Sequence, residues 1–150
     1  MVRISRLLGL SRTNQRLLLQ ATILLAAARI GLKTMSFATL RNILSKLATT
    51  GTGRIDPAAH DDTARQRIIW AVETAGRHFP AIGTCLTEAL AAHVLLARIG
   101  HQSNLQIGVT RDQNGKFVAH AWLEEDGAIV LGENWARHYT PMPKLNGLEP

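Results

Sequence analysis

Apolar residues recur at three- and four-residue steps near the start of the chain, the spacing that places them on one face of a helix. They extend an apolar run at residues 17–28. Ser11 or Thr13 would cap the start of this helix, and Gly31 would mark its end. The apolar stripe consists of Leu18, Ala21, Leu25, Ala28 and Leu32.

Two further stretches have the same helical spacing. One is expected to start within residues 57–62, where proline and acidic residues suit a first turn, and to stop at Gly76 and Pro80. The other covers residues 86–99 and is closed by Gly100. Both are short enough to be ordinary helices of a globular domain.

Three short runs after these helices have the pattern of strands, at residues 105–110, 117–124 and 128–133. Asn114-Gly115 and Asp126-Gly127 lie between them, and both dipeptides are typical of two-residue hairpin turns. The runs therefore predict an antiparallel meander. Together with the helices, they predict an α+β fold.

The second hairpin brings a histidine and a carboxylate together. With Asp126-Gly127 as the two turn residues, His120 lies directly opposite Glu133 on one face of the sheet. A three-residue loop would instead put Gly132 opposite His120 and turn Glu133 to the other face.

The first hairpin predicts the surroundings of this pair. A two-residue turn places Val109 opposite His120 and Ile107 opposite Trp122. The face that carries His120 is then apolar, and we expect it to pack against the helix at residues 86–99. An imidazole and a carboxylate on such a face are expected to pair, because burying either alone is costly.

The composition is that of a globular protein, with 150 residues of which 46% are hydrophobic and 19% charged. We predict a single domain over residues 1–150, with a basic helical segment at 1–55 and a catalytic core at 56–150. The one cysteine excludes an internal disulfide and a zinc site made of cysteines alone.

The basic charge is concentrated in the first segment. Residues 1–55 hold nine basic residues and no acidic one. No nucleic-acid-binding motif accompanies them, and Phe37 is the one aromatic residue of this segment, so nucleic acid is not the expected partner. A solvated basic face is the simplest interpretation. A surface for an acidic peptide, a partner protein or a membrane is the alternative.

The apolar run within this segment has three interpretations. A transmembrane helix needs about 20 apolar residues, and residues 17–28 are too few. A signal peptide would share the basic start and the small residues Ala26-Ala27-Ala28, but Gln20 and Thr22 interrupt its apolar part. A buried core helix fits both the length and the stripe best.

Cys85 is the candidate nucleophile. Thr84 is predicted to cap the third helix, with Glu88 reaching back towards the first turn, so that Cys85 takes the first helical position. The helix dipole and the free backbone N–H groups there stabilise a thiolate, and they can also hold an oxyanion. An inert buried cysteine is the competing interpretation.

A cysteine nucleophile needs a base, and His120 is the histidine that the predicted sheet places beside a carboxylate. Cys85, His120 and Glu133 would form a triad, with Asn134 as the alternative to Glu133. The histidines have no spacing typical of a metal site, so we expect neither a metal nor a cofactor.

Four stretches carry a resemblance to one enzyme family. They are Cys85-Leu86-Thr87-Glu88-Ala89-Leu90, Leu96-Ala97-Arg98-Ile99-Gly100, Leu105-Gln106-Ile107-Gly108-Val109 and Ala119-His120-Ala121-Trp122-Leu123-Glu124. These stretches resemble the standalone transglutaminase-like cysteine peptidases of lasso-peptide biosynthesis. The match runs from about Gly83 to Glu133, and the segment before it looks like the N-terminal helices of that family.

The resemblance implies a papain- or transglutaminase-like core and a specific reaction. These enzymes remove the leader from a ribosomally made precursor peptide, generally after a leader that has threonine at its penultimate position. The implied partners are the leader region of the precursor, a separate leader-binding protein (a RiPP recognition element) and the lasso cyclase, all in the cytoplasm. Membrane-surface contact is compatible with the basic segment but not required.

The same resemblance assigns the site residues. Cys85 matches the nucleophile and His120 the general base. The third residue of the family is usually an aspartate shortly after the histidine, where this chain has Gly132 and Glu133. Glu133 is one methylene longer than aspartate.

Two alternatives to the peptidase stay open. One is a transglutaminase-like domain that only binds a peptide or partner, and the pairing of Cys85 with His120 argues against it. The other is acyl transfer from the enzyme thioester to an amine instead of to water.

Overall fold

The computed structural model describes residues 9–50 and 62–142, in which helices precede one antiparallel sheet. The long helices are α2 (Arg12–Thr34), α3 (Phe37–Thr50), α4 (Asp62–His78) and α5 (Cys85–Arg98). After them come β1 (Asn104–Arg111), β2 (Phe117–Glu125), β3 (Ala128–Leu131), the short α6 (Glu133–Ala136) and β4 (Thr140–Pro141). The predicted α+β fold is confirmed.

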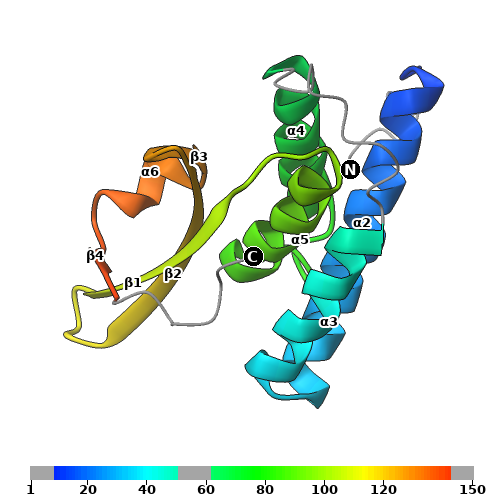
Figure 1. Cartoon of the computed structure of the whole chain (residues 1–150). Coiled ribbons are helices and arrows are strands. Elements are labelled where there is room, and N and C mark those ends of the chain that lie inside the picture. The colour runs from blue at the N-terminus through cyan, green and yellow to red at the C-terminus, as the bar shows by residue number, and fades with distance from the viewer. Residues whose placement is uncertain (1–8, 51–61, 143–150) are drawn as a thin grey trace.

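Helix α5 lies between the other long helices and the sheet (Figure 1). One apolar core joins these layers, and Leu25 of α2, Val72 of α4, Leu96 of α5 and Leu123 of β2 are fully buried in it. The helical segment thus shares its core with the sheet that carries the candidate site. The predicted division into parts 1–55 and 56–150 remains a prediction, because residues 51–61 lie outside the described residues.

Helix α2 begins as predicted but ends later. Ser11 caps it by accepting a hydrogen bond from the N–H of Asn14 (3.3 Å). The predicted end at Gly31 is wrong, because Gly31 lies inside the helix where a side chain would overlap Leu40 of α3. Glycine serves here for close helix packing and not as a stop signal.

The two faces of α2 differ in burial. Ala21, Leu25 and Ala28 of the predicted stripe are buried against α4 and α5. The outer face exposes Leu19 and Ile23, together with Ile30 about two turns after Ile23. By length and hydropathy alone α2 could also cross a membrane.

Helix α4 also contains a glycine, Gly76, at which the sequence predicted that the helix would end. The helix continues past Gly76 to His78, and Gly76 packs against the backbone of Gly83. The predicted start within residues 57–62 falls largely outside the described residues, which begin again at Asp62.

The sheet has the strand order β3-β2-β1-β4, and the β1–β2 register differs by one residue from the prediction. His120 pairs with Gly108, not with Val109. The loop holds three residues instead of two, because the N–H of Asp112 already bonds to the carbonyl of Lys116 (2.9 Å). The Asp112 carboxylate reinforces it by accepting the N–H groups of Asn114 and Lys116.

The β2–β3 turn is as predicted, but the pairing changes beyond it. Glu125 pairs with Ala128 across the Asp126-Gly127 turn, whose residues both have positive φ (50° and 78°). A β-bulge follows and shifts the register by one residue, and β3 ends at Leu131. The prediction that Glu133 lies opposite His120 in the sheet is therefore wrong.

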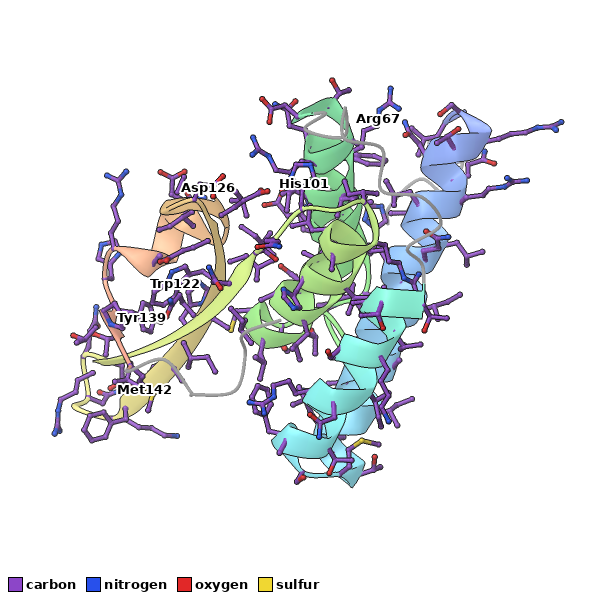
Figure 2. The ribbon with its side chains drawn as sticks, in the orientation of Figure 1. Arg67, His101, Trp122, Asp126, Tyr139 and Met142 are labelled. Atoms are coloured by element: carbon purple, nitrogen blue, oxygen red, sulfur yellow. The ribbon has the colours of Figure 1, made fainter. Side chains whose placement is uncertain are left out.

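The one-residue shift also changes which face of the sheet meets the helices. Ala121 and Leu123 join Leu105 and Ile107 in the core beside α5. The prediction that the His120 face packs against α5 is wrong, since neighbouring residues of a strand face opposite sides. Figure 2 shows Trp122 and Tyr139 on the side of the sheet away from α5.

Candidate active site

Cys85 is the first residue of α5, as the sequence predicted. Thr84 precedes it in an extended conformation (φ −121°, ψ 159°) and caps the helix. Cys85 is partly buried and carries a free thiol. The thiol therefore lies at the positive end of a 14-residue helix, where backbone N–H groups have no partner within the helix.

Thr87 closes this cap, and the prediction that Glu88 does so is wrong. The N–H of Thr84 donates to Thr87 Oγ1 (2.8 Å), and the N–H of Thr87 donates to Thr84 Oγ1 (3.4 Å). Thr87 Oγ1 also donates to the carbonyl of Ile82 (2.6 Å). A capping box needs its second side chain three residues after the cap, and Glu88 lies one residue too far.

His120 extends from β2 between two aromatic rings. Its ring stacks on Trp122 with a centroid separation of 6.3 Å and lies 5.2 Å from the ring of Tyr139. Its Nε2 atom is buried and has no hydrogen-bond partner among the described residues. The ring is therefore fixed by packing, while one nitrogen is left to bond with something that enters the site.

Gly132 lies beside this nitrogen. Its φ of +86° is one that residues with a side chain rarely adopt, and a Cβ there would lie 3.3 Å from His120 Nε2 and 3.0 Å from Trp122 Cβ. The glycine thus lets the chain leave β3 and turn into α6 close to the imidazole.

Glu133 follows Gly132 as the first residue of α6. Its carboxylate is paired with Arg137 (3.2 Å), and its side chain is 62% exposed. The structure brings Glu133 to the same cavity as His120 without a hydrogen bond between them. Asn134, the alternative orienting residue, lines that cavity as well.

A cavity of about 450 Å³ brings the predicted site residues together. Its lining residues are Glu73, Cys85, Glu88, His120, Ala121 and residues 129–134. The nucleophile from α5 and the base from β2 thus share one space that a peptide segment can enter. This arrangement suits attack by a thiolate on an acyl group, with the imidazole carrying the proton.

Two further carboxylates line this cavity, and the sequence did not identify either of them as a site residue. They are Glu88, one turn after Cys85 on α5, and Glu73, on α4. Burial, followed by repulsion from Glu73, raises the pKa of Glu88 to about 7, while Arg77 acts in the opposite direction. The three-residue step from Cys85 to Glu88 was the one available signal in the sequence.

Three other histidines, His78, His93 and His101, have structural partners. His93 Nδ1 bonds to Ser103 Oγ (2.9 Å), and burial lowers the pKa of His93. His101 pairs with the buried Glu125, and His78 bonds to the carbonyl of Thr74. Within residues 9–50 and 62–142, no three His, Cys, Asp or Glu side chains are grouped as metal ligands.

Comparison with known families places this site in a recognised context. The model of the transglutaminase-like superfamily matches residues 23–144, which include the second half of α2 and every later element. The chain belongs to the transglutaminase-like superfamily. Neither a curated protein nor a solved structure matched it. This superfamily commonly includes cysteine peptidases, and the transglutaminase-like match contains both Cys85 and His120.

Proposed function

We propose that this transglutaminase-like chain is a cysteine peptidase that cleaves the leader from a ribosomally made lasso-peptide precursor. The observation that carries the proposal is the shared cavity of Cys85 and His120. The substrate is proposed from the resemblance of residues 83–133 to standalone leader peptidases. A separate leader-binding protein would deliver the precursor in the cytoplasm, and a lasso cyclase would use the product.

The proposed reaction has two steps. His120 accepts the proton of Cys85, and the thiolate attacks the scissile carbonyl carbon while N–H groups at the start of α5 hold the oxyanion. The C–N bond breaks, the departing amine takes the proton from His120, and a thioester remains. Water then hydrolyses the thioester with His120 as base, which releases the leader carboxylate and restores the thiol.

Loss of the nucleophile is expected to abolish processing. With purified leader-binding protein and candidate precursors that have threonine at the penultimate leader position, Cys85→Ala should lower kcat/KM by about 1,000-fold or more. Mass spectrometry of the products measures this. Gln113→Ala, at an exposed loop residue, is the matched control and should cleave like the wild type. Processing by Cys85→Ala at the wild-type rate would end the proposal.

The third member of the triad is proposed to be Glu133. To orient His120, its carboxylate must exchange Arg137 for the imidazole, which the exposed pair permits because such pairs contribute little stability. We expect Glu133→Ala to lower kcat/KM more than Asn134→Ala, and far more than Asp126→Ala in the β2–β3 turn. The reverse order of Glu133 and Asn134 would assign the role to Asn134.

Acyl transfer to an amine is the second candidate, because the family also contains transferases. The same thioester would then react with an amine. Cleavage in the presence of 10 mM glycine ethyl ester distinguishes the two. A peptidase releases the free carboxylate, whereas a transferase yields the glycine ester adduct.

A further inference from the structure

The cavity beside Cys85 has an acidic side. Glu73 from α4 and Glu88 from α5 line it, whereas Ile129 and Val130 form an apolar side at β3. None of the described lining residues is a lysine or an arginine. Glu133, the third carboxylate, already has Arg137 as its partner. The carboxyl groups without a strong ion pair are therefore Glu73 and Glu88, and the raised pKa of Glu88 leaves it only partly ionised near pH 7.

The Glu88 carboxyl group occupies a space prepared for it by a glycine. A Cβ on Gly76 of α4 would overlap Glu88 Oε1 and lie 2.8 Å from its Cδ. Gly76 is itself buried against Gly83, which lies two residues before Cys85 in the chain. Any residue with a side chain at position 76 would displace the carboxyl group. The position of Glu88 in the cavity is thus fixed by packing between α4, α5 and the segment before Cys85.

This carboxyl group lacks hydrogen-bond donors among the described residues. No described residue donates a hydrogen bond to Glu88, although part of its surface is buried. Arg77 is the cation that acts on it, but the Arg77 guanidinium approaches Thr74 Oγ1 (3.4 Å) and forms no ion pair with Glu88. A half-buried carboxylate without donors gains free energy from any cationic group that enters beside it.

We propose that Glu88, assisted by Glu73, is a specificity-determining residue that binds a lysine or arginine side chain of the substrate peptide next to the scissile bond. The apolar side at β3 takes a neighbouring apolar side chain. This inference rests on the proposed peptidase function, and it names the substrate class of the same cavity. It depends on charge complementarity between a basic peptide segment and the Glu73–Glu88 pair.

Binding tests the inference without requiring cleavage. The probes are libraries of acetylated hexapeptide amides with one fixed position occupied by Lys, Arg, Gln or Glu, and the protein is full-length Cys85→Ala. At pH 8, where Glu88 is ionised, we expect the best Lys or Arg library to bind about tenfold more tightly than its Gln counterpart at low salt. Added salt should reduce that ratio. Equal binding of the Lys and Gln libraries, or no binding of any, would overturn the inference.

Variants assign the preference to the acidic pair. Glu88→Gln keeps the shape that fits beside Gly76, and we expect it, in the Cys85→Ala background, to bring the Lys-to-Gln ratio close to 1. Glu73→Gln, on the other helix, should lower the ratio as well and serves if Glu88→Gln does not fold. Asp126→Asn removes one negative charge outside the cavity and should keep the ratio. An unchanged ratio in both cavity variants would overturn the assignment.

The two proposals fail in different ways. If Cys85→Ala processes precursors like the wild type, the peptidase function fails whatever the binding ratio. If the wild type cleaves precursors but the libraries show no preference for a cation, only the role of Glu88 fails.

Discussion

Packing on three sides holds the imidazole ring of His120 in place. Trp122 and Tyr139 flank it, and the backbone of Gly132 approaches Nε2. A buried nitrogen without a partner is destabilising by about 1–3 kcal/mol. A substrate group that reaches Nε2 and forms a hydrogen bond with it would recover that free energy. The packing that fixes the ring thus favours the binding of such a group.

At the same scale, Glu88 makes stability depend on pH. Its pKa rises from 4.5 to about 7 in the folded chain, because burial and Glu73 outweigh Arg77. The folded state therefore binds this proton more tightly, and the resulting stability is full below pH 4.5 and lost as the pH rises through 7.

We predict that Glu88→Gln, which cannot ionise, has a higher Tm than the wild type at pH 8. The difference should shrink towards zero at pH 4.5, where Glu88 of the folded wild type is protonated. Thermal unfolding followed by circular dichroism at half-unit pH steps measures it. A difference in Tm that is the same at every pH would contradict the assigned ionisation.

Cys85 was chosen from a local signal, a lone cysteine directly after a threonine cap. His120 was chosen from a predicted pairing with Glu133 that the sheet does not contain, and from the family resemblance. Both side chains nevertheless line the cavity. Glu73 could not be chosen in this way. It reaches the cavity only because Gly76 and Gly83 let α4 approach the start of α5, which is a tertiary contact without a linear signal.

At the scale of the element, the start of α5 depends on Thr87. This residue is fully buried, and its hydroxyl group links the N–H of Thr84 to the carbonyl of Ile82. Replacing it with valine would keep the volume but leave both backbone groups without these bonds. The first turn of α5, which carries Cys85, would lose its fixed position.

We predict that Thr87→Val lowers the free energy of unfolding by about 1–3 kcal/mol, together with kcat/KM. Urea unfolding and peptide cleavage measure the two effects. Thr110→Val on β1 is the control, because the Thr110 hydroxyl makes no hydrogen bond within the described residues. If Thr87→Val and Thr110→Val were equally stable, the cap would not fix the start of α5.

The strands show where local reasoning stops. The turn residues Asp126-Gly127 predicted their own pairing correctly, because positive φ at both positions suits that turn. The turn dipeptides did not indicate the bulge two pairs further on, nor the longer loop at Asn114 that the hydrogen bonds of Asp112 close. Each moved residues by one position, and one position was enough to exchange the faces of the sheet.

At the scale of the whole molecule, a buried ionic network ties the helices to the sheet. Glu125, at the end of β2, accepts from His101 in the loop after α5 and from Arg65 of α4 (3.4 Å). His101 lies where this loop passes α4 (Figure 2). Glu125 and His101 are both more than 90% buried, so removing the carboxylate would leave positive or polar groups without it.

We predict that Glu125→Ala lowers the free energy of unfolding by about 3 kcal/mol, and that Glu125→Gln, which keeps an acceptor for His101, lowers it less. Urea unfolding at pH 7 measures both. Because the network lies outside the candidate cavity, the folded fraction of each variant should retain its activity per molecule. Equal stability of the alanine and glutamine variants would show that the acceptor contributes little.

The overall class of the molecule was easier to predict than its layers. Apolar stripes and turn dipeptides indicated helices followed by an antiparallel sheet, and that order is confirmed. The short helix α6 and the edge strand β4 were not predicted, because they hold only four and two residues. Elements this short are stabilised by contacts such as Tyr139 against Gly108, which depend on the finished fold.

Because the chain has one cysteine, every thiol that it carries is the candidate nucleophile. A thiol-reactive dye therefore labels the protein at Cys85 alone, and no other cysteine has to be replaced first. Counting dye per chain gives the fraction of chains with a reactive Cys85, and the rate of labelling reports how freely molecules enter the cavity. The single thiol thus allows labelling to measure how much of the candidate site is accessible.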